Sequence, residues 1–129
     1  MAELSGRCLC GGVTLRVRGE ILGSNHCHCE SCRRASSSPV TSFFTVAMGD
    51  ASLTGDTLGS YASSPGVQRG FCKGCGTPLS YQSEQRPGEI DYYVMLLDEP
   101  GAIAVERHDH WNERVGWIGL ADDLPKHEG

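Results

Sequence analysis

The sequence predicts an all-β fold of many short strands joined by tight turns, with little helix. Glycine and proline are spread along the chain, 17 and 6 among 129 residues, as is typical of short strands joined by tight turns. Val13, Leu15 and Val17 alternate with polar residues, which is the period-two pattern of a strand. Two pairs of cysteines, each followed by glycine, indicate metal-binding turns around which the sheets are organised.

The strands are expected in the following order. The first, at 13–17, has one face exposed to water. The next, at 41–48, is rich in aromatic and β-branched residues and ends at the turn signal Gly49-Asp50. Shorter extended segments are expected at 58–61, 67–71 and 78–82. Ile90–Leu97 is apolar on both alternating faces, which favours a central buried strand.

Helix is expected at one place only, a short turn over 29–35. The segment from Trp111 to Gly129 contains scattered apolar residues without a clear period, and we expect it to pack as a closing flap.

The chain length predicts one domain over residues 1–129. Its longest apolar stretch, Tyr92–Leu97, is far too short to cross a bilayer, and residues 1–10 lack the pattern of an export signal. We therefore expect a cytoplasmic protein without a membrane partner. The net charge of −5 argues against a nucleic-acid partner, since phosphate binding needs a basic surface.

Seven cysteines are the strongest functional signal in the sequence. In a reducing cytosol, clustered cysteines bind metal or react more often than they form structural disulfides. Cys8 with Cys10 and Cys72 with Cys75 form two knuckles, and four thiolates from two knuckles make a closed tetrahedral zinc site. The alternative for these pairs is thiol exchange, which usually accompanies a thioredoxin-like βαβ pattern that this sequence lacks.

A second group, Cys27, Cys29 and Cys32, offers three thiols within six residues. Structural zinc sites are closed, whereas catalytic ones keep an open position, so three ligands indicate a reactive site. The alternative is a second structural zinc with His108 or His110 as fourth ligand. His26 and His28 are weaker candidates for that position, because strand alternation points them away from Cys27 and Cys29.

The cysteine motifs, taken together, resemble those of the glutathione-dependent formaldehyde-activating enzyme family, which also includes the centromere protein V domain. The matching segments are Cys8-x-Cys10-Gly11, Cys27-His28-Cys29-x-x-Cys32-Arg33, Arg69-Gly70-Phe71-Cys72-x-x-Cys75-Gly76-Thr77-Pro78-Leu79, Leu97-Asp98-Glu99-Pro100, Trp117 and Asp123-Leu124-Pro125. The resemblance covers nearly the whole chain. The resemblance implies an all-β fold of two small packed antiparallel sheets, with one zinc held by Cys8, Cys10, Cys72 and Cys75. It implies a second zinc at Cys27, Cys29 and Cys32, where thiol binding and carbon–sulfur chemistry occur. Many members carry a glycine where this chain has Ser37 or Ser38.

Three thiolates give Zn²⁺ a net charge of −1, which makes it a weak Lewis acid but a good partner for a further thiolate. The hypothesis that follows is a carbon–sulfur lyase or synthase in which the sulfur of glutathione, the co-substrate, takes the fourth position. The bond made or broken joins that sulfur to the carbon of a small aldehyde such as formaldehyde. The alternative is a non-enzymatic zinc-binding interaction module.

Glutathione has two carboxylates, which guanidinium groups bind well. Arg33, Arg34 and Arg69 are the candidates for that contact. The alternative is that Arg33 and Arg34 form a solvated face while Arg69 pairs with an acidic neighbour. Glu30, His28 and Tyr61 are the candidates for a general acid.

Overall fold

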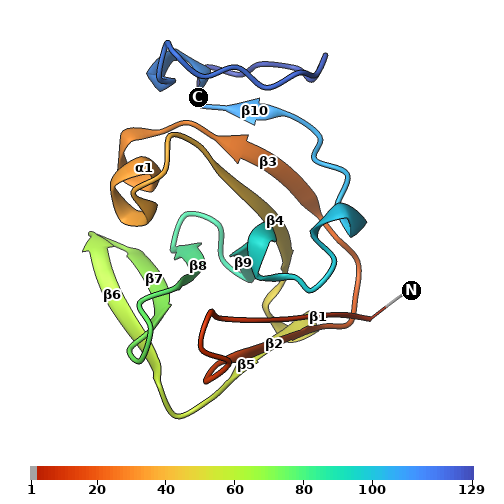
Figure 1. Ribbon diagram of the computed structural model, residues 1–129, viewed down its shortest axis with the longest axis vertical. Coiled ribbons are helices and arrows are strands. Elements are labelled where there is room, and N and C mark those ends of the chain that lie inside the picture. Colours follow the sequence, from red (N-terminus) through yellow and green to blue (C-terminus); the bar gives the residue numbers. More distant parts are fainter. Residues whose placement is uncertain (1–2) are drawn as a thin grey trace.

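The computed structural model describes residues 3–129 and is mostly β, with 41% strand and 15% helix in two sheets (Figure 1). The expected fold class is confirmed. The smaller sheet is antiparallel and has three strands in the order β1 (Leu4–Arg7), β2 (Thr14–Val17) and β5 (Ala51–Thr54).

The larger sheet has seven strands, in the spatial order β10-β3-β4-β9-β8-β7-β6. In chain order its strands are β3 (Gly23–Cys27), β4 (Thr41–Ala47), β6 (Leu58–Ser64), β7 (Val67–Cys72), β8 (Pro78–Ser83), β9 (Glu89–Tyr93) and β10 (His108–Asp109). Its neighbours pair antiparallel except at one edge, where β10 runs parallel to β3. The expectation of purely antiparallel sheets therefore fails at this two-residue strand.

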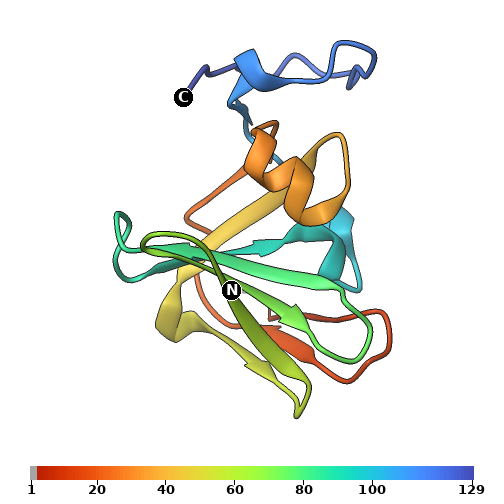
Figure 2. The same ribbon diagram turned by 90° about the vertical axis from the view of Figure 1, so that its left-hand side faces the viewer.

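The core lies between the two sheets (Figure 2). Leu15 and Val17 of β2 and Phe44 and Val46 of β4 belong to one buried cluster. Strand β1 also contacts the segment that follows β9, because Gly6 bridges to Leu97 and a side chain at Gly6 would collide with the backbone of Leu96. Apolar burial across this interface is the main force holding the sheets together.

The strands expected from the sequence are confirmed to within a few residues, with one correction. The strand expected over Ile90–Leu97 ends at Tyr93, and a 3₁₀ turn, η2 (Val94–Leu96), follows. A segment with apolar residues on all of its faces fits a buried 3₁₀ turn as well as a buried strand. As expected, β9 is interior to the sheet, between β4 and β8.

The helix α1 (Glu30–Ser36) begins one residue later than expected, because Cys29 is its N-cap and accepts a hydrogen bond from the Cys32 amide. The helix ends at Ser37 in the left-handed conformation, with φ 54°. The other helical elements are 3₁₀ turns: η1 (Met48–Asp50), η3 (Pro100–Ala102) and η4 (Trp111–Glu113). No helix within residues 3–129 has the length and apolar character needed to span a membrane.

The segment after η4 has little regular structure and lies alongside β10 at the edge of the large sheet (Figure 1). A backbone bridge between His108 and Lys126 joins it to β10. It thus packs against the fold at this edge, next to the end of β3 from which Cys27 projects.

Candidate metal centres and the adjoining pocket

The first cysteine group assembles from two tight turns, one between β1 and β2 and the other between β7 and β8. The sulfurs of Cys8, Cys10, Cys72 and Cys75 all lie within 4.8 Å of one another. Each turn contains a glycine at positive φ just after its second cysteine, Gly11 at 81° and Gly76 at 80°. Amides at 3.3 Å point at the first two sulfurs, Gly12 N at Cys10 and Val13 N at Cys8. Such donors stabilise thiolate ligands.

The second cysteine group forms at the junction of β3 and α1. Cys27 ends the strand, Cys29 caps the helix, and Cys32 lies in its first turn. The Cys27 sulfur is 3.5 Å from that of Cys29 and 3.6 Å from that of Cys32. The amide of Cys32 points at the Cys29 sulfur at 3.3 Å, and the pKa of the Cys29 thiol is lowered by donors from Cys27 and Cys32.

Both groups fit zinc. Sulfurs bound to zinc at about 2.3 Å in a tetrahedron lie about 3.8 Å apart, whereas the sulfurs of a disulfide are about 2.05 Å apart. The separations here are 3.6 Å between Cys8 and Cys10, 3.8 Å between Cys10 and Cys72, and 3.5–3.6 Å in the second group. All seven cysteines are free thiols. Two clusters of soft sulfur donors at this spacing could each hold a zinc ion.

Within residues 3–129, no histidine or carboxylate joins the second group. His108, one expected alternative donor, bonds instead to His28 and Asp122. His110, the other, lines the pocket beside the cysteines but lies outside the donor set. The described residues thus supply three clustered sulfur donors at the second cysteine group.

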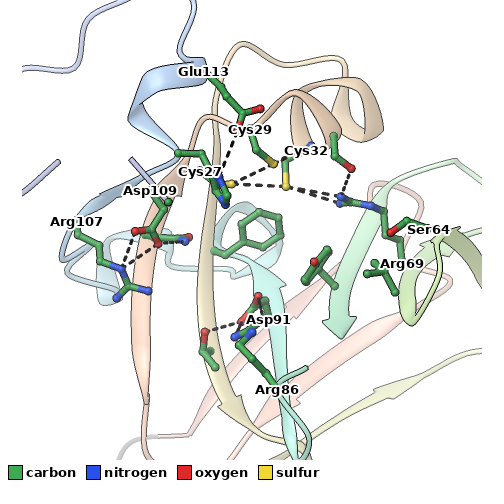
Figure 3. A pocket seen from close by; sticks show the side chains of 18 residues that line it. Cys27, Cys29, Cys32, Ser64, Arg69, Arg86, Asp91, Arg107, Asp109 and Glu113 are labelled. Carbon is green, nitrogen blue, oxygen red and sulfur yellow. Dashed lines mark hydrogen bonds and ion pairs between the residues drawn. The ribbon is translucent and has the colours of Figure 1, made fainter. Parts of the chain in front are cut away.

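A pocket of about 630 Å³ opens onto the three sulfurs of the second group (Figure 3). Its wall contains two internal ion pairs. Arg86 binds Asp91 through both terminal nitrogens of its guanidinium group, and Arg107 Nε donates to Asp109 at 2.9 Å. These paired charges and the cysteines are lining residues of one cavity, so a ligand at the sulfurs also meets fixed positive and negative groups.

Arg69 of β7 lines this pocket beside Cys32 (Figure 3). Only 7% of it is exposed, and its guanidinium is 3.8–3.9 Å from the Cys32 sulfur and 2.9 Å from the Ser31 hydroxyl. Burial opposes its charge, but the charge and hydrogen bonding of Cys32 outweigh burial and raise the pKa of Arg69. Arg69 therefore faces a sulfur rather than a carboxylate partner.

The other two candidate arginines lie elsewhere. Arg33 donates to the carbonyl of His28, and exposed Arg34 pairs with Glu30 one helical turn away. Neither lines the pocket at the sulfurs. Of the general-acid candidates, Glu30 is in this surface pair, and Tyr61 lines a separate apolar pocket between α1 and β6.

The third general-acid candidate, His28, belongs to a buried chain of hydrogen bonds. Its Nε2 is 2.9 Å from His108 Nδ1, and His108 Nε2 is 3.0 Å from Asp122 Oδ2. Because the carboxylate accepts from His108 Nε2–H, His108 Nδ1 must accept from His28 Nε2–H. Burial is the main cause that lowers the pKa of His28 to about 4, so His28 is neutral at pH 7.

The pocket contains four functional candidates that the sequence reasoning missed: Arg86, Arg107, His110 in the role of a pocket residue, and Glu113. Residues two apart in an extended segment lie on the same face, so the spacing of Arg107 and Asp109 was a usable signal for their ion pair. Arg86 comes from the loop between β8 and β9 and Glu113 from η4, both far from the cysteines in the sequence. No local pattern links them to the cysteines.

Comparisons with known proteins relate the chain to one family and one solved fold. Residues 3–114 match the family model described as glutathione-dependent formaldehyde-activating enzyme. A Schizosaccharomyces pombe protein named an uncharacterized lyase is 40% identical over 96 residues, which is 73% of this chain and 69% of that protein. A crystal structure of a Rhodobacter sphaeroides protein aligns with a TM-score of 0.61 at 21% identity, covering 95% of this chain and 98% of the other. This last likeness concerns the fold.

Proposed function

Because this chain belongs to the glutathione-dependent formaldehyde-activating enzyme family, we propose that it is a zinc-dependent carbon–sulfur lyase acting on glutathione adducts of a small aldehyde. The reaction is that of an S-(hydroxymethyl)glutathione synthase, run in either direction. The observation that supports it most is the pocket that opens onto the three sulfurs of Cys27, Cys29 and Cys32.

The two cysteine groups have different proposed roles. Cys8, Cys10, Cys72 and Cys75 would hold a structural zinc, because four protein sulfurs complete its coordination. Cys27, Cys29 and Cys32 would hold the second zinc. When bound there, that ion supplies a place for the glutathione sulfur and lowers the pKa of its thiol.

The pocket suits glutathione in size and in charge. About 630 Å³ lies within the range of small-molecule sites, roughly 300–1,000 Å³. Glutathione has two carboxylates and one ammonium group, and the pairs Arg86–Asp91 and Arg107–Asp109 present both signs of charge on the wall. We propose Arg86 and Arg107 as carboxylate contacts and the aspartates as ammonium contacts.

Arg69 has a different proposed role from the two wall arginines. Its guanidinium reaches the sulfur cluster and has no carboxylate partner among the described residues. When the thiol adds to the aldehyde, negative charge develops on the carbonyl oxygen next to the new carbon–sulfur bond. A buried cation at this position stabilises that oxygen.

The proposal is tested by mixing the zinc-loaded protein with glutathione and formaldehyde and following their exchange with S-(hydroxymethyl)glutathione by NMR magnetisation transfer. We expect the protein to accelerate exchange in proportion to its concentration. Cys29→Ser, which removes a donor of the second group only, is the control and should abolish the acceleration. Binding of glutathione without any acceleration would contradict lyase activity and favour a zinc-binding interaction module.

A further inference from the structure

We infer that His110, held by Glu113, is the acid–base group that carries a proton between the glutathione sulfur and the aldehyde oxygen. The inference rests on the proposed function and assigns a catalytic residue to it. His110 lines the pocket that contains the three cysteines, and Glu113 lines it too.

The reaction needs one proton transfer in each direction. On addition, the thiol proton leaves the sulfur, the sulfur electron pair forms the carbon–sulfur bond, and the carbonyl π electrons move to oxygen. The proton must then reach that oxygen to give the neutral hydroxymethyl adduct. A single group that accepts the proton from sulfur and returns it to oxygen balances the reaction, with no net change in the protein.

The contacts of His110 suit this task. Its Nδ1 is 3.3 Å from Glu113 Oε2, drawn as the dashed line from Glu113 in Figure 3. This contact favours a proton on Nδ1, which leaves the Nε2 lone pair free to accept another, and the carboxylate stabilises the imidazolium that results.

Glu113 is itself fixed from the other side. Its Oε1 accepts a hydrogen bond from the Glu30 amide at 2.9 Å, at the first residue of α1. The same helix begins at Cys29 and contains Cys32. One carboxylate thus connects the imidazole to the helix that carries two of the three sulfurs. This link sets the distance between His110 and the reacting centre.

Several other titratable groups near the sulfurs are already engaged. Arg69 keeps its proton because its pKa is raised. Asp91 and Asp109 are bound to arginines. His28 is tied to His108 and does not line the pocket. Among the residues lining this pocket, His110 is the only histidine, the side chain that exchanges a proton most readily near neutral pH.

His110→Gln tests the inference in the zinc-loaded protein. We expect exchange of S-(hydroxymethyl)glutathione to fall by roughly 100-fold or more, the usual effect of losing a general acid–base group. The cobalt-substituted variant should keep the thiolate-to-cobalt absorption of the wild type and the same Kd for glutathione. His127→Gln changes an exposed histidine outside the pocket and should leave exchange unchanged.

Glu113 is a positioning residue, and Glu113→Gln gives a second readout. The amide oxygen still accepts from the Glu30 amide but lacks the charge that stabilises the imidazolium. We expect the exchange rate at saturating substrate to fall about tenfold while the Kd for glutathione stays constant, since acid–base assistance spans roughly 10²–10⁴-fold in total. A change in Kd alone would contradict this role.

Three results would overturn the inference, and they are distinguishable. Unchanged exchange in His110→Gln removes the acid–base role and leaves the proposed function standing. A changed cobalt spectrum or loss of the second metal in His110→Gln identifies His110 as a metal ligand. Absence of acceleration by the wild type overturns the proposed function itself, and the inference with it.

Discussion

Arg69 is the only arginine, lysine, aspartate or glutamate within residues 3–129 that is buried. Burying a charge is costly unless it is paired. Its neighbours are the Cys32 sulfur, two serine hydroxyls at 2.9 and 3.1 Å, and the face of Tyr81. The compensating charge must therefore come from the thiolate cluster, which has a net charge of −1 when it holds zinc.

Arg69→Met removes this charge while keeping much of the apolar stem. We expect exchange of S-(hydroxymethyl)glutathione to slow by about 100-fold, the typical cost of losing one donor to a developing oxyanion. Arg16→Met, which alters an exposed arginine paired with Glu3, is the matched control. Equal rates for the two variants in the NMR exchange experiment would contradict the role of Arg69.

Ser37 carries backbone strain at the end of α1. It occupies the C-cap of α1 at φ 54°, a conformation that glycine adopts readily and serine does not. We expect Ser37→Gly to raise the free energy of unfolding by about 0.5–1 kcal/mol, measured by urea denaturation. Ser38→Gly removes a hydrogen bond to the Val40 carbonyl and should lower the free energy of unfolding. Stabilisation by both, or by neither, would show that backbone strain is not the cause.

At the level of single residues, the sequence separated the seven cysteines into two groups of four and three, because ligand spacing is a local property. The sequence could not distinguish His108 from His110, two residues apart, as the alternative fourth ligand of the second group. That choice depends on β10 pairing parallel with β3, which places His108 beside His26 and over His28. A two-residue strand leaves no periodic signal.

At the level of elements, the junction of β3 and α1 positions the reactive group. The buried chain Asp122–His108–His28 fixes this junction from behind, since His28 lies between two cysteines of the group. His28 Nδ1 has no hydrogen-bond partner among the described residues, so the chain ends there and does not continue to the pocket. Its role is to hold the ligand-bearing loop in place.

Asp122→Ala leaves the buried Nε2–H of His108 without an acceptor. We expect the free energy of unfolding to fall by about 1–3 kcal/mol, the cost of an unsatisfied buried donor. Asp122→Asn keeps an oxygen at this position and should cost less. Asp123→Ala changes an exposed neighbour and should stay within about 0.5 kcal/mol of the wild type. Urea midpoints that agree for Asp122→Ala and Asp123→Ala would argue against the buried chain.

Strands with clear alternation or apolar runs were predictable, as β2, β4, β7 and β8 show. Those missed lack such patterns. β3 reads Gly-Ser-Asn-His-Cys, and it is a strand because antiparallel pairing with β4 satisfies its backbone groups. β1 and β5 are four-residue edge strands whose place depends on β2 lying between them. These segments are strands because they pair with other strands of the folded chain, and the sequence of a single segment does not encode that pairing.

At the level of the whole molecule, the two cysteine groups connect different parts of the fold. The first joins the β1–β2 turn of the small sheet to the β7–β8 turn of the large one. The second lies within one junction of the large sheet. Loss of metal from the first therefore removes a link between the two sheets, whereas loss from the second affects one loop and a short helix.

Cys75→Ser and Cys29→Ser compare these roles directly. Metal binding at a structural site supplies folding free energy, roughly 10 kcal/mol or more, so Cys75→Ser should leave the protein unfolded. Cys29→Ser should stay folded and lose one zinc per chain. Circular dichroism with metal analysis checks both expectations. Equal loss of structure in the two variants would mean that both zinc ions are structural.

We propose that a metal ion held by the second cysteine group keeps one coordination position for a thiol from outside the chain. Titrating glutathione into the cobalt-substituted protein is the decisive experiment, because the thiolate-to-cobalt absorption reports each added sulfur ligand. We expect this absorption to grow with glutathione in the wild type and not in Cys29→Ser. Absorption in the wild type that stays constant up to saturating glutathione would contradict it.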